Sequence, residues 1–331
     1  MSPASRKPAK AKSRRVRRVS DDMPWVEIPI FIHGIMPGKN PTMCRKQYGE
    51  LHRGVQASLK NYPKNDFSGF ASEIPIVWGR PPHDGIKPDL NQPQQLLSDV
   101  EINIESLARK NMKAAYAGIL GLHGMVRDWL FFGASDLIYY VSGDGEASVR
   151  NHVFIEIAQA ISKRISDPNE RFSLTIFGHS AGSLIAHDLL FHLFSKKKHK
   201  SENTTSMASY MDELRQMVKE DRLRLRRLYT FGSPITPMTL RADSLVEKFY
   251  NKEKLEPEAL GLRDGQDGLS NPRWVNFWSR YDIASYPVDA LYSNSNGIIH
   301  DEEIRTSISP GAAHGSYWTS GQMADYIAKT L

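Results

Sequence analysis

The chain has 331 residues, of which 40% are hydrophobic and 24% charged. This composition is that of a soluble globular protein with a full core, in one large α/β domain or two smaller ones. Cys44 is the only cysteine, so an intramolecular disulfide and a cysteine-based metal site are excluded. Its thiol is expected to be structural or at the surface.

The formal net charge of +6 comes from a basic N-terminal tail. Residues 1–20 hold eight Lys and Arg residues and no acid, and without them 35 basic residues face 37 acidic ones. We predict a disordered tail over residues 1–22 and a catalytic domain over residues 23–331. Such a tail is either a solvated leader or a contact for anionic lipid, nucleic acid or an import receptor.

The tail lacks the apolar region of a secretory signal peptide. The sequence contains no uninterrupted apolar run of about 18 residues, so no membrane-spanning helix is predicted. We therefore expect a cytoplasmic protein, with peripheral contact to an anionic membrane through the tail as an option.

Apolar runs of strand length alternate with helix-like segments along the domain. Strands are expected at residues 27–32, 74–78, 136–141, 172–177, 228–231, 274–278 and 298–304. Helices are expected at residues 42–60, 147–165 and 183–190, with a closing helix from about Gly321. Pro29 and Pro75 donate no ladder hydrogen bond, which predicts irregularity near the start of the first two strands. The alternation predicts an α/β fold with a mostly parallel central sheet and helices on both faces.

Three stretches depart from this alternation and are interpreted as lid-like or surface insertions. Residues 79–133 include the apolar segment 112–132, whose three charged residues favour a buried or lid helix pair over membrane contact. Residues 196–222 begin with a basic run and predict a surface loop before a charged helix. Residues 237–271 are charged and predict either a lid or a decorated loop.

The pentapeptide G-x-S-x-G at residues 178–182 follows the strand at 172–177 and precedes an apolar helix. By chance alone, such a pentapeptide arises roughly one time in ten in a chain of this length, so the context decides its meaning. A sharp turn between strand and helix exposes a serine as a nucleophile, and Gly178 and Gly182 leave room for close packing around it. We predict that Ser180 is this nucleophile.

A nucleophilic serine needs a base, and the base needs an orienting acid. His314, in a small-residue loop before the final helix, is the expected base, with His300 as the rival. The expected acid is Asp282, directly after an apolar strand, with Asp289 and Asp301 as alternatives. If Asp282 has a structural role instead, it is expected to pair with Arg280 or to cap a turn. The histidines at 179, 187 and 192 are interpreted as packing or surface residues.

The oxyanion formed during acyl transfer needs backbone donors. The N–H of Ala181 is the expected first donor, because it follows the nucleophile. The second is expected from the turn after the first strand, His33-Gly34-Ile35-Met36, with the amide of Ile35 or Met36 as the donor.

These segments resemble the α/β-hydrolase superfamily, and within it the lipase-like serine esterases, from about residue 28 to the C-terminus. The His33-Gly34 turn, G-H-S-A-G at 178–182 and T-F-G-S-P at 230–234 fall in the order seen there. The last of these, the strand before Asp282, and the H-x-x-Y-W spelling from His314 to Trp318 resemble the fungal-type (class 3) lipases. The resemblance implies ester hydrolysis through an acyl-enzyme, with Ser180, Asp282 and His314 as the triad. Ala181 stands where many lipases carry leucine, which leaves the substrate open.

The expected function is cleavage of carboxylic esters, of small molecules or lipids, without a metal or organic cofactor. Aromatic residues near the expected site, such as Tyr281 and Tyr317, favour an acyl chain, while Trp278 and Trp318 are interpreted as core. One alternative is an acyltransferase that passes the acyl group to an alcohol or thiol. Another is a non-catalytic hydrolase fold that binds a partner. Nucleic-acid binding is not favoured, because no aromatic-interleaved basic motif occurs.

Overall fold

The computed structural model describes residues 24–34, 41–65, 73–78, 143–196, 205–240, 242–264 and 269–331. The predicted tail at 1–22, the predicted strand at 136–141, the insertion at 79–133 and the expected oxyanion donor Ile35 lie outside these residues.

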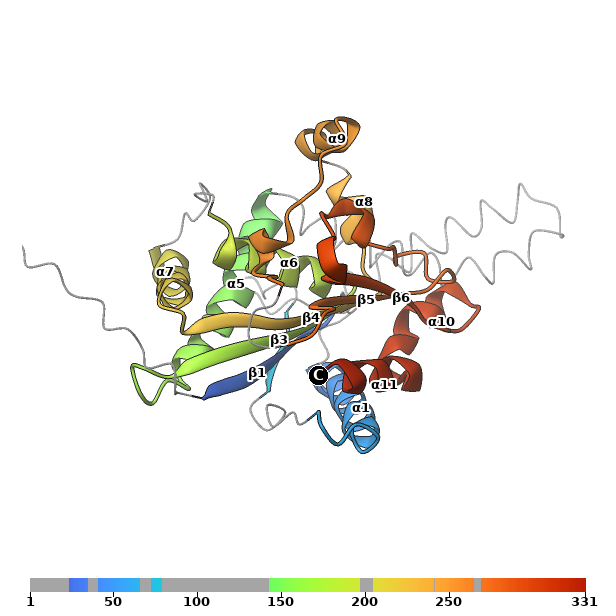
Figure 1. The fold of residues 1–331 in the computed structure, drawn as a ribbon, viewed down its shortest axis with the longest axis horizontal. Coiled ribbons are helices and arrows are strands. Elements are labelled where there is room, and N and C mark those ends of the chain that lie inside the picture. Colours follow the sequence, from blue (N-terminus) through green and yellow to red (C-terminus); the bar gives the residue numbers. More distant parts are fainter. Residues whose placement is uncertain are drawn as a thin grey trace, which may run out of the picture.

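Six parallel strands form the sheet, in the order β2-β1-β3-β4-β5-β6 (Figure 1). Their bounds are β1 Trp25–Ile32, β2 Ile74–Ile76, β3 Arg171–His179, β4 Leu223–Phe231, β5 Trp274–Trp278 and β6 Ile299–Glu303. The predicted α/β fold with a parallel sheet is therefore confirmed. Of the seven predicted strands, the six within the described residues are present.

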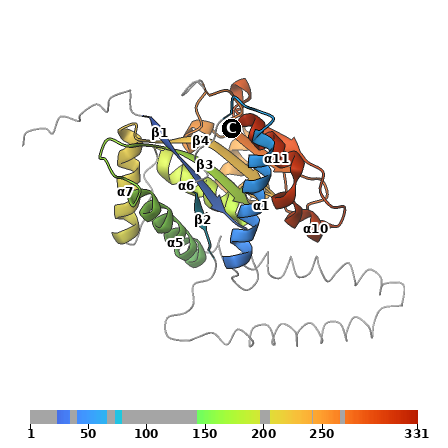
Figure 2. The ribbon, with the colours of Figure 1, turned by 90° about the horizontal axis from the view of Figure 1, so that it is seen from below.

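Helices cover both faces of the sheet, as predicted. Their bounds are α1 Pro41–Leu59, α5 Gly143–Ser162, α6 Ala181–Phe194, α7 Thr205–Lys219, α8 Ile235–Thr239, α9 Asp243–Tyr250, α10 Pro310–Gly315 and α11 Gly321–Thr330. Short 3₁₀ helices are η4 Pro257–Leu260, η6 Asp289–Leu291, η7 Ser295–Gly297 and η8 Ser316–Thr319. Helices α1 and α11 pack together on one face, and α5, α6 and α7 pack on the other (Figures 1 and 2).

Successive side chains of each strand enter the two cores in turn. In β1, Ile28, Ile30 and Ile32 pack with α5 and α6, while Phe31 packs with α1 and α11. This alternation follows from the two-residue period of a strand. Because both faces are covered, the parallel strands are apolar throughout, which is why they stand out in the sequence.

Strand β4 is longer than predicted, since it begins at Leu223 instead of 228. The missed residues include three arginines that break the apolar pattern. Arg224 places its guanidinium 3.6 Å from the ring centroid of Trp25, and the buried Arg227 donates to the carbonyls of Ser270 and Pro272. These contacts satisfy charges that the sequence pattern counts against a strand.

Pro29 lies within β1, an interior strand, without breaking the sheet. Pairing of β1 with β2 begins only at Ile30, opposite Ile74, whereas pairing with β3 runs the whole length of β1. At Pro29 the ladder has a neighbour on one side only, so a residue with no N–H is tolerated there. This arrangement accounts for the irregularity predicted near the strand start.

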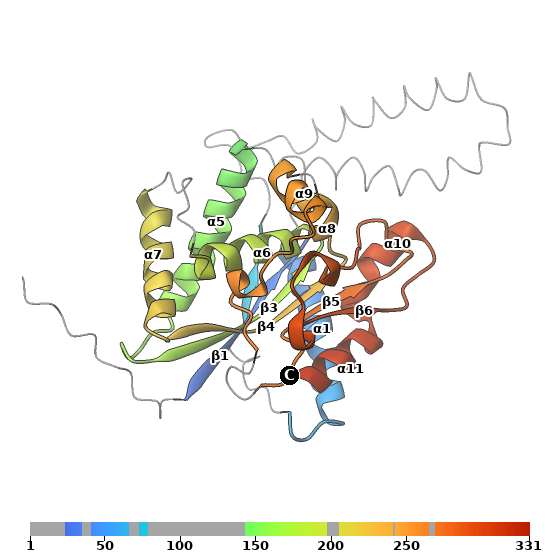
Figure 3. The ribbon, with the colours of Figure 1, turned by 45° about the horizontal axis from the view of Figure 1, so that its top comes forward.

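The second and third predicted insertions contain regular structure. Helix α7 buries Met211, Leu214 and Met217 against the core shared with α5, so this part belongs to the helix layer. The third insertion holds α8, α9 and η4, and α9 buries none of its residues (Figure 3). Within the described residues, no helix is both long and apolar enough to cross a membrane.

Candidate active site

The sheet order creates a switch point between β1 and β3. Strand β2, the next described strand after β1 in the chain, lies on one side of β1, and β3 lies on its other side. The connections after these two strands therefore leave in opposite directions, and open α/β sheets bind their ligands at such a point. Gly34 follows β1 and Ser180 follows β3 at this point, where Ile32 and Gly178 are register partners.

Ser180 has a backbone conformation that non-glycine residues rarely adopt, with φ 53° and ψ −127°. Three hydrogen bonds hold it there: its N–H donates to the carbonyl of Phe231 at 3.0 Å, and its carbonyl accepts from the N–H and the hydroxyl of Ser183 at 2.9 and 2.5 Å. Strain of this kind persists only where the surroundings fix it, and it marks functional sites. The turn predicted at Ser180 has the expected geometry.

Glycines allow backbone segments to approach closely around this serine. A Cβ at Gly34 would lie 2.4 Å from the Cβ of Ser180 and 3.0 Å from its Oγ. A Cβ at Gly182 would lie 2.3 Å from the carbonyl oxygen of Ile32. Real atoms do not come this close, so any side chain at either position would push the first strand away from the serine turn.

His314 and Asp282 meet at the carboxyl ends of β5 and β6. The Nδ1–H of His314 donates to the carboxylate of Asp282, 3.0 Å from each oxygen. The carboxylate also accepts the N–H of Ala284 at 3.0 Å and the hydroxyl of Tyr317 at 2.9 Å. The side chain of Asp282 is buried and that of His314 is one eighth exposed, so the carboxylate is enclosed while the imidazole keeps access to solvent. His314 lies in α10, whereas a loop was expected there.

The pKa of Asp282 reflects two opposing effects. Burial by itself raises it, but the hydrogen bond and charge of His314, together with the Ala284 and Tyr317 donors, lower it overall. The carboxylate therefore stays ionised and acts as a permanent acceptor. An ionised acceptor holds Nδ1 protonated, which leaves Nε2 of His314 as the basic nitrogen.

His179 packs beside His314, which agrees with its interpretation as a packing residue. Its ring centroid lies 4.8 Å from that of His314, and its Nε2–H donates to the backbone carbonyl of His314 at 2.9 Å. Burial, with repulsion from His314, lowers the pKa of His179 to about 3, so the ring is neutral. Its position as the last residue of β3, beside Ser180, was the available signal that it lies near the site.

Gly232 packs against all three polar side chains near the base. A Cβ there would lie 3.2 Å from Cε1 of His314, and 3.3 Å from both Oδ2 of Asp282 and Nε2 of His179. Its φ of +60° is also in the left-handed region that favours glycine. The T-F-G-S-P segment thus brings the end of β4 into the site.

The turn after β1 is tied to β2 through His33. Its Nδ1–H donates to the carbonyl of Gly34, and its Nε2 accepts the N–H of Trp78 at 3.1 Å. Burial lowers the pKa of His33 to about 4, which keeps the ring neutral and this pattern intact. Ala181, the other expected oxyanion donor, is the first residue of α6, where helix N–H groups have no carbonyl partner within the helix.

The rival residues have other partners. His300 is in β6 and contacts Glu302 at 2.9 Å. Asp301 accepts the N–H groups of Val288 and Asp289, so it holds a turn. Arg280 pairs with Glu303 instead of Asp282.

Comparison with protein-family models and with curated protein sequences gave no match for this chain. Among the described residues, no group of three or more His, Cys, Asp or Glu side chains is placed to hold a metal ion. The function must therefore be argued from the geometry of the site.

Proposed function

We propose that this protein is a serine hydrolase of the α/β-hydrolase fold that cleaves carboxylic esters. The observation that carries the proposal is the His314–Asp282 pair, with both carboxylate oxygens 3.0 Å from Nδ1, at the edge of the sheet that holds the strained Ser180. The strand order supports it as well. The serine, acid and base follow the third, fifth and sixth strands of the sheet, in the chain order expected after a G-x-S-x-G turn.

In the first half of the proposed reaction, Oγ of Ser180 attacks the carbonyl carbon of the ester. The proton of the hydroxyl passes to Nε2 of His314, and the imidazolium that forms is stabilised by Asp282. The oxyanion is held by the N–H of Ala181 and by an amide of the turn after Gly34, for which Ile35 is the proposed donor. Each such donor typically lowers the barrier by about 3 kcal/mol.

The tetrahedral intermediate then collapses, and the C–O bond to the alcohol breaks. His314 returns its proton to the leaving alkoxide, which departs as the alcohol. Water attacks the acyl-enzyme in the second half, with His314 taking its proton, and the acid product leaves as Ser180 regains its hydrogen. The protein supplies the nucleophile, the base and the donors, and one water molecule is consumed as the ester is converted to an alcohol and an acid.

Hydrolysis of a chromogenic ester tests the proposal. We expect Ser180→Ala to abolish activity and Asp282→Asn to lower kcat on the order of ten-thousand-fold, because the asparagine holds the wrong tautomer of the base. Asp301→Asn is the matched control for the acid. Equal losses in the two aspartate variants would contradict the assignment of Asp282.

An ester series of increasing chain length, assayed below and above the aggregation threshold of each ester, defines the substrate class. A jump in rate above the threshold indicates a lipase, and its absence indicates an esterase for dissolved substrates.

A further inference from the structure

Large apolar side chains remain exposed at eight of the described residues: Met43, Leu240, Val246, Tyr250, Tyr281, Ile283, Tyr286 and Ile308. Met43 is in α1 and Val246 and Tyr250 are in α9, which lie on opposite sides of the sheet (Figure 1). Exposed apolar residues are ordinary when scattered, so only a group of them near the site indicates a contact surface.

Four of these side chains are close to Asp282 or His314 in the sequence. Tyr281, Ile283 and Tyr286, which flank Asp282 in the loop after β5, are 45%, 44% and 42% exposed. Ile308, just before α10, is 79% exposed. Within the loop, Asp282, Ala284 and Ser285 are buried while Tyr281, Ile283 and Tyr286 are exposed, so one short segment contributes to both the site and its apolar rim. We call Tyr281, Ile283, Tyr286 and Ile308 the apolar rim.

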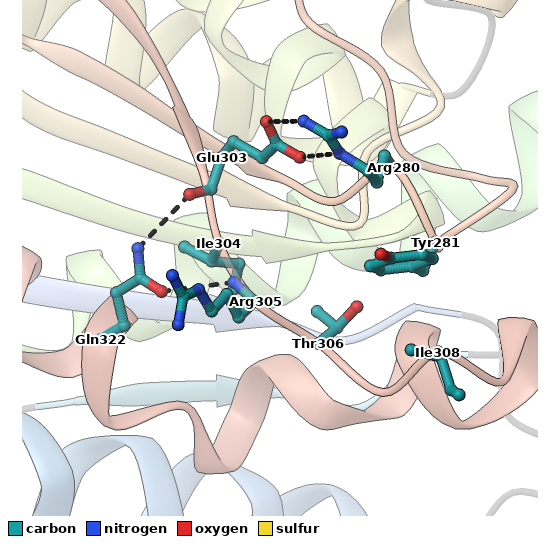
Figure 4. Close-up of a pocket in the computed structure, with 8 residues that line it drawn as sticks. All are labelled: Arg280, Tyr281, Glu303, Ile304, Arg305, Thr306, Ile308 and Gln322. Carbon is teal, nitrogen blue, oxygen red and sulfur yellow. Dashed lines mark hydrogen bonds and ion pairs between the residues drawn. The ribbon is translucent and has the colours of Figure 1, made fainter.

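A hollow of about 630 Å³ lies beside the rim, between the loop after β5 and the segment after β6. Tyr281 and Ile308 form one end, Arg305 and Gln322 form the other, and Thr306 lies between them (Figure 4). Arg280 also lines the hollow, but Glu303 binds its guanidinium at 2.5 and 2.9 Å. Arg305 forms no ion pair with any described residue, so two arginines and one glutamate are the charged side chains among the described residues that line the hollow.

We propose that this edge docks on a lipid surface with anionic headgroups, with the apolar rim entering the interface and Arg305 binding a headgroup phosphate. A bilayer offers both acyl chains and phosphates, which matches Tyr281 and Ile308 at one end of the hollow and the guanidinium of Arg305 at the other. Tyrosine suits the boundary between them, because its ring is apolar and its hydroxyl is wet. A soluble anion in the hollow would leave Ile283, Tyr286 and most of Ile308 in water.

The basic residues 1–20 precede Trp25 in the sequence, and Trp25 begins β1 at the amino edge of the sheet. The rim lies at the carboxyl edge. The two contributions to lipid binding can thus be separated by substitution at the rim in the full-length chain.

Cosedimentation with vesicles tests the proposal, using the Ser180→Ala protein so that no lipid is cleaved. We expect binding to vesicles of phosphatidylcholine mixed with phosphatidylglycerol, and weaker binding to phosphatidylcholine alone. Ile308→Ser should lower the partition coefficient about tenfold, and Arg305→Ala about fivefold, on the mixed vesicles only. Lys163→Ala, an exposed cation at the opposite edge, is the matched control and should bind as the parent does.

Binding that is unchanged in both Ile308→Ser and Arg305→Ala would overturn the proposal and assign lipid contact to the basic residues 1–20. Absence of binding to either vesicle would overturn it too. So would a dimer in sedimentation velocity that Ile308→Ser dissociates, because the rim would then be a contact between copies. The readout needs no catalysis, so its failure is distinguishable from failure of the proposed hydrolase activity.

Discussion

His179 donates its Nε2–H to the backbone carbonyl of His314 at 2.9 Å, and so links the residue before the nucleophile to the residue that carries the base. We expect His179→Ala to lower kcat by about tenfold to a hundredfold with little change in KM, because small displacements of a base are costly. The measurement is steady-state kinetics of ester hydrolysis, with rates normalised to titrated active sites.

His179→Gln is the matched variant, since its amide can still donate to that carbonyl. Partial recovery of kcat indicates positioning through the hydrogen bond. If both variants lose only thermal stability and keep kcat per active site, the contact is structural.

The hydroxyl of Tyr317 donates to Oδ2 of Asp282 at 2.9 Å. A hydrogen bond to an ionised group contributes about 1.5–3 kcal/mol, so we expect Tyr317→Phe to lower kcat by at least about tenfold. Tyr62 offers a matched control outside the site. Its hydroxyl donates to Asp325 at the same distance, 2.9 Å. Tyr62→Phe should keep its activity, and an equal loss in both variants would show that Tyr317 has no special role.

Alanine substitutions at Gly232 and at Gly297 distinguish the effect of backbone strain from the effect of crowding against His314. Both have positive φ, +60° and +66°, but a Cβ at Gly297 meets nothing within 4 Å. Alanine at either position should cost about 1–2 kcal/mol in the free energy of unfolding. Only Gly232→Ala should also lower kcat, because its methyl group displaces His314. Full activity in folded Gly232→Ala protein would refute this crowding.

Three histidines with lowered pKa values make stability depend on pH. Burial lowers the pKa of His33 and His187 to about 4 and of His179 to about 3. Below about pH 6.5 the unfolded chain binds protons that the folded chain does not, so stability present at pH 7 is lost as pH falls towards these values. Each ring contributes up to about 1.4 kcal/mol per pH unit.

Urea unfolding at pH 7 and pH 5 measures this loss. His187→Asn should reduce the pH dependence, whereas His152→Gln, at an exposed position, leaves the three rings in place and should not. Equal stability at the two pH values would contradict the prediction.

The sequence predicted the parts of the fold that depend on local pattern. Strand β5 has the predicted bounds, 274–278, because a run of apolar residues is buried on both faces. The pairing of His314 with Asp282, 32 residues apart, followed from placing both beyond carboxyl ends of strands. For residues just beyond strand ends, the order of the strands along the chain was enough to predict that the side chains meet.

Contacts that depend on register could not be predicted. The hydrogen bond from His179 to His314 was not expected, because no pattern shows that the end of β3 faces α10. The start of β4 was missed because Arg224 and Arg227 look solvated until Trp25 and the carbonyl of Pro272 are seen beside them. Side chains paired across the sheet carry no local signal.

Reaction with a fluorophosphonate tests the central claim most directly, because it reports on the nucleophile alone. Peptide mass mapping should find one adduct, on Ser180, in the wild-type protein, and no adduct in Ser180→Ala. Labelling of His314→Ala should be much slower, since the serine then lacks its base. An adduct on another serine, or undiminished labelling of Ser180→Ala, would contradict the account.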